Sequence, residues 1–207
     1  MSLSRRAVVA LAFPLAGIVG GRVACAAEPG SAPALIESFY GDLLAVMKQA
    51  KRLSFDERYA RLAPAISRTF DLGLMTRLAV GPTWAQIAPD QQQRLSAAFS
   101  RYTISMYANR FDDYGGERFE VAPTASANPN GVLVTSQLVK TNGEAVSLNY
   151  LMRQDAARAW KVIDVYLSGT VSELAARRSE FVAVLQRKGA EGLVELIEQR
   201  TAALRTG

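Results

Sequence analysis

The sequence predicts an α+β domain in which a four-stranded, curved antiparallel sheet packs against N-terminal and C-terminal helices. Apolar residues recur at helical spacing before residue 112 and after residue 170, whereas between these points they alternate with a period of two. The predicted strands are joined by short connections, which favour antiparallel pairing. With 207 residues and a hydrophobic share of 49%, the chain suits one compact domain with a substantial core.

Polar residues mark the starts of the first two predicted helices. Residues 31–33 begin the first helix, and Ser54 with Glu57 forms a capping box for the second. We expect Pro64 to end the second helix, because proline interrupts helical hydrogen bonding. The first helix has one broad apolar face, made of Leu35, Ile36, Phe39, Tyr40, Leu43, Leu44 and Met47.

The next two predicted helices differ in length. Asp71 is placed to cap a short helix that Gly81-Pro82 breaks. Pro89 suits the first turn of a long helix that runs to about Phe111 and is followed by a turn at residues 114–116. The long helix has the most aromatic face in the chain, made of Leu95, Phe99, Tyr102, Met106 and Tyr107.

Four strands follow, and then two helices. The strands contain Phe119 with Val121, residues 132–139, residues 145–152 and residues 160–167, and Asn142-Gly143 favours a type I′ hairpin between the second and third. Thr170 with Glu173 forms a second capping box, and we expect the helix that follows to stop at Gly189. Spacing of Leu193, Leu196, Ile197 and Leu204 predicts the last helix.

Residues 1–27 have the three zones of a secretory signal peptide. Arg5 and Arg6 precede an apolar stretch over residues 7–20, and Ala24-Cys25-Ala26 supplies small residues for cleavage. The alternative is a permanent membrane anchor, although Pro14 interrupts the stretch and its length is short for a bilayer. We therefore expect a cleavable signal peptide over residues 1–27 that exports the chain to the periplasm, and a single α+β domain over residues 28–207.

Composition excludes several classes of site. The chain has no histidine, and its one cysteine, Cys25, lies in the predicted signal peptide. Zinc, haem, copper and iron–sulfur sites and Ser–His–Asp triads depend on residues that the mature chain would lack. Carboxylates alone could still hold magnesium or calcium, but no Asp-rich loop has the required spacing, so we expect no metal and no cofactor. Without residues 1–27 the chain has 21 basic and 19 acidic residues, a balance that carries no nucleic-acid signature.

Candidate acid–base groups are few. Asp112-Asp113 is a carboxylate pair at the end of the long helix, and we expect it to lie in solvent because no base or nucleophile accompanies it. Asp164 is a lone acid in an apolar strand, and we expect it to point outward and pair with Arg153 or Lys161. The sequence therefore predicts no catalytic residue.

Two other features have both a structural and a functional interpretation. The aromatic helix face and the apolar strands predict either an ordinary filled core or an apolar pocket, which periodicity cannot distinguish. A basic run on the late helix is either a solvated face or a surface that docks onto lipid headgroups or an acidic partner. Its members are Arg177, Arg178, Arg187 and Lys188.

Several short runs, taken in order, resemble one known family. They are residues 81–84 (Gly-Pro-Thr-Trp), residues 114–123 (Tyr-Gly-Gly-Glu-Arg-Phe-Glu-Val-Ala-Pro) and residues 160–165 (Trp-Lys-Val-Ile-Asp-Val), followed by Gly169, Ser172, Phe181 and Gly189. Over residues 35–204 the chain resembles the MlaC or toluene-tolerance family of periplasmic lipid-binding proteins associated with ABC transporters. Residues 70–72, 149–154 and 177–181 resemble most the HpnM branch, which is encoded with hopanoid biosynthesis.

The resemblance implies a cystatin-like or nuclear-transport-factor-like fold with an apolar cavity between sheet and helices. It also implies a non-catalytic carrier of a hopanoid or phospholipid that works with membrane-bound transporter components, and we expect a monomer. The alternatives are an adaptor protein with a filled core and an enzyme of hopanoid processing, which the lack of histidine and thiol disfavours. The residues that we expect to line the cavity are Met75, Leu78, Trp84, Phe99, Tyr102, Met106, Leu148, Tyr150, Met152, Trp160 and Val165.

Overall fold

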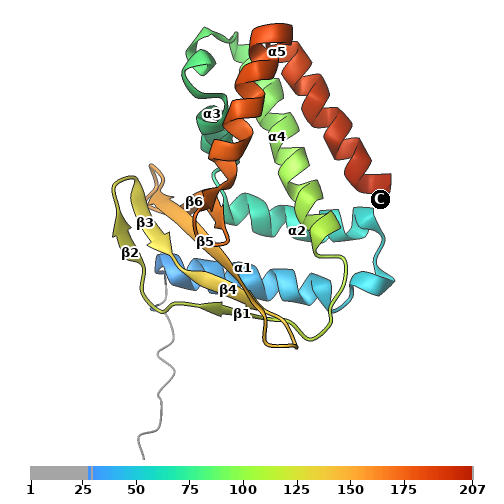
Figure 1. Cartoon of the computed structure of the whole chain (residues 1–207), viewed down its shortest axis with the longest axis vertical. Coiled ribbons are helices and arrows are strands. Elements are labelled where there is room, and N and C mark those ends of the chain that lie inside the picture. Colours follow the sequence, from blue (N-terminus) through green and yellow to red (C-terminus); the bar gives the residue numbers. More distant parts are fainter. Residues whose placement is uncertain (1–27, 29, 207) are drawn as a thin grey trace, which may run out of the picture.

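The computed structural model describes residue 28 and residues 30–206, so the predicted signal peptide lies outside the described residues. Five helices and one antiparallel sheet form the fold, as the α+β prediction requires (Figure 1). The helices are α1 (Ala32–Met47), α2 (Phe55–Thr69), α3 (Leu72–Val80), α4 (Pro89–Arg110) and α5 (Glu173–Thr206), with short 3₁₀ turns at Ala50–Arg52 and Gly81–Gln86. No helix within these described residues is both long and apolar enough to cross a bilayer.

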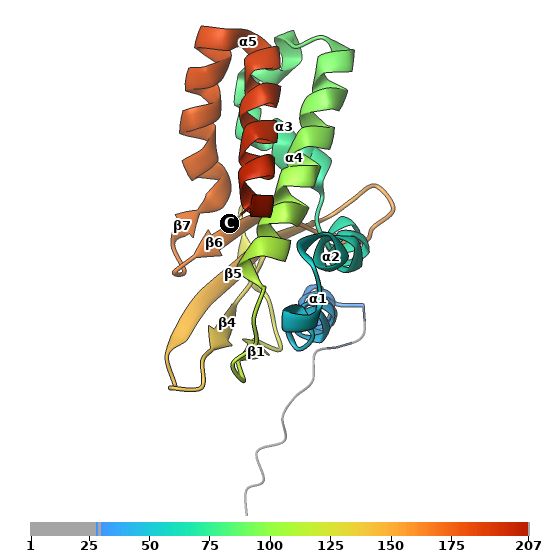
Figure 2. The same ribbon diagram turned by 90° about the vertical axis from the view of Figure 1, so that its right-hand side faces the viewer.

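The helices form two groups around the sheet. Figure 2 shows α1 and α2 lying along one face of the sheet, while α3, α4 and α5 stand together beyond its end. Contacts agree with this view, because α1 packs on α2 and on three strands, and α4 packs on α2, α3 and α5. The long helix α4 therefore joins the helical group to α2, which in turn contacts β6 of the sheet.

Helix starts follow the capping predictions in the first half of the chain. The Ser54 hydroxyl accepts a hydrogen bond from the Glu57 amide, and the Glu57 carboxylate accepts one from the Ser54 amide at 2.7 Å, which confirms the capping box. The prediction that Pro64 ends α2 is wrong, since the helix continues to Thr69. Ala65 and Ile66, just after the proline, are buried in the core, and their burial offsets the hydrogen bond that proline cannot donate.

The start of α5 also differs from its prediction. Residues Val171–Ser172 form a short strand, β7, and the helix begins at Glu173, so Thr170 is not its cap. Instead the Ser172 hydroxyl accepts a hydrogen bond from the Ala175 amide at 2.9 Å. The predicted interruption at Gly189 is confirmed, because its φ of 65° and ψ of −171° divide α5 into two helical segments.

The sheet has seven strands rather than four. They are β1 (Arg118–Val121), β2 (Ser126–Asn128), β3 (Gly131–Val134), β4 (Ser136–Val139), β5 (Ala145–Gln154), β6 (Trp160–Leu167) and β7. The predicted strand over residues 132–139 is two strands, β3 and β4, which pair with different halves of β5. At the break the Ser136 amide donates to the Asn149 side chain, so a side chain replaces the regular ladder there.

Gly131 occupies a position that a larger residue fits poorly. Its φ is +150°, and a Cβ there would collide with the Met152 carbonyl oxygen on β5. We expect Gly131→Ala to lower the free energy of unfolding by about 1 to 3 kcal/mol, measured by chemical denaturation. Gly41→Ala is the control, because Gly41 is exposed within α1 with nothing near its Cβ position, and alanine should raise stability by up to about 1 kcal/mol. Equal stability of Gly131→Ala and the unaltered chain would contradict this account.

Candidate functional site

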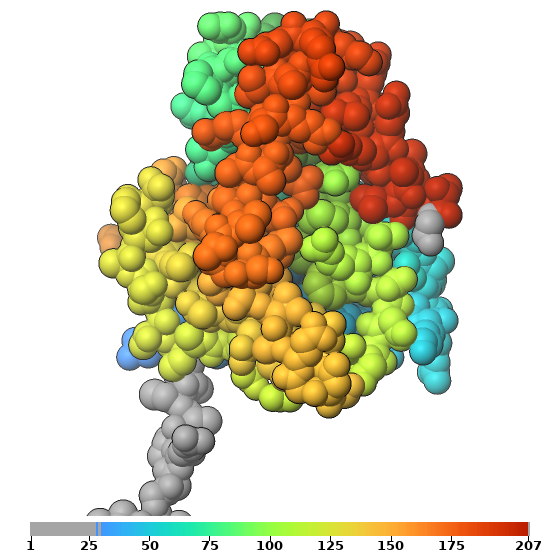
Figure 3. All heavy atoms as spheres, viewed as in Figure 1, coloured from blue at the N-terminus to red at the C-terminus, as the bar shows by residue number. Residues whose placement is uncertain are grey.

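A cavity of about 500 Å³ lies between α4, the sheet and the start of α5. This volume falls within the range of about 300 to 1,000 Å³ that is typical of sites for small organic ligands. Figure 3 shows its opening as a hollow bordered by α4, β5 and the start of α5. The side chains that line it are Met47, Phe70, Met75, Phe99, Thr103, Met106, Tyr107, Arg110, Phe111, Asp112, Asp113, Glu117, Leu138, Val146, Leu148, Tyr150, Val165, Leu167, Ser168, Glu173, Leu174 and Arg177.

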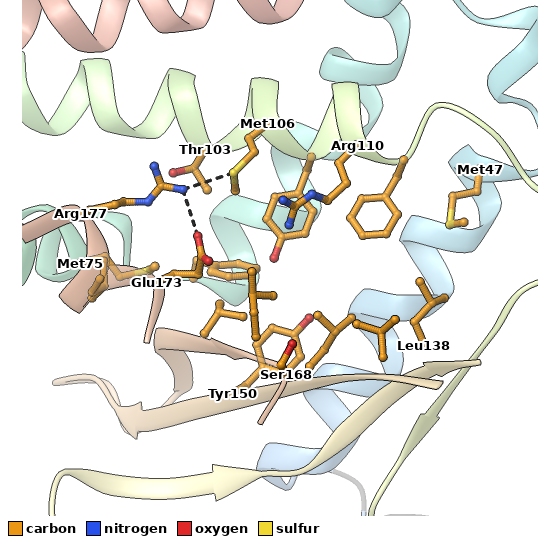
Figure 4. Close-up of a pocket in the computed structure, with 18 of the residues that line it drawn as sticks. Met47, Met75, Thr103, Met106, Arg110, Leu138, Tyr150, Ser168, Glu173 and Arg177 are labelled. Carbon is orange, nitrogen blue, oxygen red and sulfur yellow. Dashed lines mark hydrogen bonds and ion pairs between the residues drawn. The ribbon is translucent and has the colours of Figure 1, made fainter. Parts of the chain in front are cut away.

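One face of the sheet forms a wall of this cavity. Leu148 and Tyr150 on β5 line it, as do Val165 and Leu167 on β6, because every second residue of a strand points to the same side. The register places Tyr150 opposite Val165 and Leu148 opposite Leu167, so the four side chains form one patch. Figure 4 shows Tyr150 rising from its strand toward α4.

Aromatic rings form another part of the wall. Phe70 and Tyr107 meet edge to face with centroids 5.7 Å apart, and Tyr107 stacks on Phe111 at 5.7 Å. Phe39 lies behind this group, fully buried, with its ring 5.3 Å from Phe70 and 5.6 Å from Tyr107. Such offset and edge-on contacts hold the rings in place, so this wall is rigid before any ligand enters.

Three tyrosine hydroxyls lie close to one another at the inner wall. The Tyr40 hydroxyl is 2.7 Å from the Ser136 hydroxyl, and the Tyr150 hydroxyl lies near those of Tyr40 and Tyr107. Burial raises the pKa of Tyr40 to about 12, and it also raises the pKa values of Tyr107 and Tyr150. At neutral pH all three phenols are therefore protonated and offer neutral hydroxyl groups.

These raised pKa values predict a loss of stability in alkaline solution. The folded chain holds the Tyr40 proton up to about pH 12, whereas the unfolded chain releases it near pH 10.0, so stability falls as the pH rises through this window. For Tyr40 alone the loss is about 2 to 3 kcal/mol, at about 1.4 kcal/mol for each unit of pKa shift. Denaturation at a series of pH values measures how steeply the free energy of unfolding falls with pH, and Tyr40→Phe should make this fall less steep. If the free energy of unfolding of the variant falls equally steeply with pH, Tyr40 does not contribute to the alkaline loss of stability.

The mouth of the cavity carries charged residues from two regions. Arg110, Asp112, Asp113 and Glu117 lie at the end of α4 and in the turn after it. The Asp113 carboxylate is 3.3 Å from the Lys51 ammonium and accepts a hydrogen bond from the Tyr114 amide, which together hold its pKa below the usual value. The carboxylate pair is exposed, as predicted from the sequence.

Arg177 occupies the end of the cavity near the start of α5. Its guanidinium contacts the Glu173 carboxylate at 3.3 Å and the Met106 sulfur at 3.3 Å, as Figure 4 shows, and it lies 5.0 Å from the centre of the Tyr102 ring. The side chain is only 14% exposed. Arg177 therefore bridges α5 and α4 and closes this end of the cavity.

The structure brings six of the eleven predicted lipid-site residues together in the cavity wall: Met75, Phe99, Met106, Leu148, Tyr150 and Val165. The other five lie elsewhere. Met152 is fully buried in the core, and Leu78 borders a separate groove on the opposite face of the sheet. Tyr102, Trp84 and Trp160 are half-buried and pack against the core outside the cavity, Trp84 in the turn at Gly81–Gln86.

Some lining residues have no signal in the sequence that separates them from the core. Phe70 follows α2, and Phe111 follows α4, so neither belongs to the periodic face of a helix. Tyr107 is one residue beyond Met106 on the aromatic face of α4, where both residues reach the cavity. Only the packing of α2 and α4 against the sheet brings these three rings to one place.

The four basic residues of the late helix differ in their exposure. Arg177 is half-buried in the cavity wall, and Arg178 donates hydrogen bonds of 2.5 and 3.0 Å to the Leu78 carbonyl oxygen of α3. Arg187 and Lys188 are exposed near the break at Gly189. The first two therefore attach α5 to its neighbouring helices, and Arg178, Arg187 and Lys188 are all exposed.

Asp164 has a structural role that differs from its prediction. It is 7% exposed, and it accepts hydrogen bonds from the Leu174 amide at 3.2 Å and the Ser172 hydroxyl at 2.5 Å. The expected pairing with Arg153 or Lys161 is wrong, because β7 folds over this part of β6 and supplies closer donors. Within the described part of the chain, no cluster of three or more carboxylates and thiols has the spacing of a metal site.

Comparisons with known proteins agree with this arrangement. A phospholipid-binding protein from Ralstonia solanacearum, solved in complex with a phospholipid, superposes with a TM-score of 0.73 at 27% sequence identity, covering 84% of this chain and 98% of that one. No curated protein matches the chain in sequence. The family model described as MlaC protein matches residues 37–199. Because this match covers most of the chain, the protein belongs to the MlaC family.

Proposed function

We propose that this protein is a periplasmic lipid-binding carrier that takes part in intermembrane transport of a hopanoid or a phospholipid with an ABC-type system. The observation that carries the proposal is the cavity of about 500 Å³ with its largely apolar wall. A lipid that crosses an aqueous compartment must hide its hydrocarbon from water, at about 0.8 kcal/mol for each methylene. The cavity supplies this shielding, and the charged mouth leaves a polar headgroup in contact with water.

The comparisons support the lipid as ligand. The Ralstonia protein is a phospholipid-binding protein of the same fold, and it was solved with a phospholipid bound. The signal-like residues 1–27 support export to the periplasm. The resemblance of the sequence to the HpnM branch supports a hopanoid as the alternative ligand to a phospholipid.

The volume of the cavity favours a carrier over an adaptor protein with a filled core. A filled core leaves spaces of the size of a few water molecules at most, whereas this interior has room for a small organic molecule. We propose that the protein binds and releases its ligand without catalysis and acts as a monomer that meets membrane-bound transporter components. Release from such burial requires a partner or a change of conformation that lowers the affinity.

A transfer assay between vesicles tests the carrier role. Donor vesicles contain a fluorescent phospholipid at a self-quenching density, acceptor vesicles contain none, and residues 28–207 are added in solution. The proposal predicts that transfer becomes faster in proportion to protein concentration, as a soluble carrier requires. A transfer rate equal to that without protein, for both a labelled phospholipid and a labelled hopanoid, would contradict it.

A further inference from the structure

Arg177 is the least exposed of the ion-paired cations among the described residues, yet its pairing is a single long contact. Its side chain is 14% exposed, whereas the cations of the other ion pairs are at least 39% exposed. Arg94 and Arg200 each donate through both terminal nitrogens to one carboxylate. Arg177 instead contacts Glu173 through Nη2 alone, at 3.3 Å. Because a guanidinium is costly to remove from water without full hydrogen bonding, this arrangement indicates a missing anionic partner.

The donors of Arg177 are largely unoccupied by strong acceptors. The second contact of Nη2 is the Met106 sulfur, a weak acceptor that also lines the cavity. The Tyr102 ring lies 5.0 Å away and attracts the positive charge, but it supplies no oxygen. Within the described part of the chain, Nε and Nη1 have no hydrogen-bond partner, and neither atom is sealed from open space. A phosphate oxygen is a stronger acceptor than any of these neighbours except the Glu173 carboxylate.

Thr103 adds a hydroxyl group at the same end of the cavity. It lies one turn before Met106 on α4, and Figure 4 shows both side chains at the end of the cavity where Arg177 enters. Thr76 and Thr201 donate their hydroxyl protons to the carbonyl oxygen four residues earlier. Among the described residues the Thr103 hydroxyl has no partner, and it is not sealed from open space. Since Thr103 is only 5% exposed and lines the cavity, its hydroxyl is available to a ligand there.

We propose that Arg177 and Thr103 bind the phosphate group of a lipid whose hydrocarbon fills the rest of the cavity. This inference rests on the proposed function and narrows its ligand to a phosphate-bearing lipid. A phosphate has several acceptor oxygens, which match the planar fork of a guanidinium and leave one for a hydroxyl donor. The start of α5 borders the opening, so the remainder of the headgroup extends into water. A neutral polycyclic lipid gains nothing from Arg177.

Glu173 has the opposite effect on such a ligand. Its carboxylate also lines the cavity, and its contact with Arg177 places a negative charge beside the proposed phosphate. Like charges at this range repel, most strongly where little water lies between them. The site therefore predicts changes of opposite sign, since loss of Arg177 weakens binding of a phosphate-bearing lipid and loss of the Glu173 charge strengthens it.

Two lipids that differ only in the phosphate test this site. The probes are oleoyl lysophosphatidic acid and mono-oleoylglycerol, kept below the concentrations at which they form micelles. Displacement of a fluorescent apolar dye from residues 28–207 measures both affinities. We expect the phosphate lipid to bind about tenfold more tightly, the effect of a hydrogen bond to a charged group. Glycerol phosphate has the phosphate without the hydrocarbon, and it should not displace the dye.

Variants locate the effect through the ratio of the two affinities. Arg177→Gln should reduce the ratio to about one, and Arg177→Lys should give an intermediate value, because lysine keeps the charge but not the fork. Glu173→Gln should raise the ratio about threefold. Arg187→Gln is the matched control, since Arg187 is exposed and lies outside the cavity wall. A merely structural role of Arg177 would weaken both lipids alike and leave the ratio unchanged.

Arg110 provides a competing location for the phosphate. It lines the cavity at the last residue of α4, and Figure 4 shows it on the other side of Met106 from Arg177. We expect Arg110→Gln to lower the ratio less than Arg177→Gln does. The reverse order would place the phosphate at the Arg110 end and overturn the assignment.

The remaining outcomes separate this inference from the proposed function. Equal affinity for the two lipids in the unaltered protein, a ratio that survives Arg177→Gln, or dye displacement by glycerol phosphate would overturn the phosphate site and leave the carrier role intact. If Arg177→Gln does not fold, the unaltered protein and Glu173→Gln still decide the result. Failure of both lipids and of stearic acid to displace the dye would overturn the carrier role as well.

Discussion

Replacing Val165 with tryptophan should weaken lipid binding at least about tenfold. Val165 lies on β6, opposite Tyr150, and lines the cavity. An indole in place of an isopropyl group takes space that hydrocarbon would otherwise fill, and excluding only two methylenes costs about 1.6 kcal/mol, which is already more than tenfold in affinity. Dye displacement by stearic acid measures the loss.

Val171→Trp is the matched control for this variant. Val171 lies on β7, is 54% exposed, and is not part of the cavity wall. The same substitution there should leave lipid affinity unchanged. Equal binding by Val165→Trp and the unaltered chain, with both folded by circular dichroism, would show that hydrocarbon does not occupy this cavity.

Truncating Phe39 should cause the largest loss of stability among single substitutions in the aromatic group. Phe39 is fully buried in α1, and its ring contacts those of Phe70, Tyr107 and Tyr40 at centroid distances of 5.3, 5.6 and 5.9 Å. Phe39→Ala removes these contacts and leaves an internal space, at a cost of about 3 to 5 kcal/mol. Chemical denaturation measures the change in the free energy of unfolding.

Phe55→Ala provides the comparison for the same change in side chain. Phe55 begins α2 and is only half-buried, with the Arg205 guanidinium 5.5 Å from its ring centre. The expected loss is about 1 kcal/mol, because less apolar surface returns to water and the chain can close over the site. A loss at Phe39 no larger than at Phe55 would mean that the ring cluster does not support the cavity wall.

The local elements of the fold were predictable because their signals lie within a few residues. The Ser54–Glu57 capping box, the Asp71 cap and the stop at Gly189 each depend on groups close in sequence, and the structure confirms all three. The failures arise where distant segments decide the result. Burial against the core carries α2 past Pro64, and pairing with β6 turns residues 171–172 into a strand.

The sequence did not decide whether the interior holds a cavity, because the same apolar periodicity describes a filled core and a hollow one. Alternation along β5 places Leu148, Tyr150 and Met152 on one face, and the irregularity beside Met152 is an extra residue, Ile163, on β6. Met152 is nevertheless fully buried in the core and does not line the cavity, a difference that periodicity does not predict. Phe70 and Phe111, at the ends of helices, reach the cavity only through tertiary packing.

The basic residues of α5 show the same limit of prediction from sequence. Charge patterning identified Arg177 and Arg178 as a surface run, yet the structure uses both to join α5 to other helices. Long side chains with apolar stems pack along neighbouring elements as readily as they enter solvent, so sequence does not reveal which occurs.

Native mass spectrometry of residues 28–207, purified from a Gram-negative periplasm without detergent, tests directly whether the cavity holds a lipid. The account predicts a species heavier than the polypeptide by the mass of one lipid, which dissociates on unfolding and is absent from Val165→Trp. A spectrum of bare polypeptide alone, unchanged after incubation with phospholipid and with hopanoid, would contradict it.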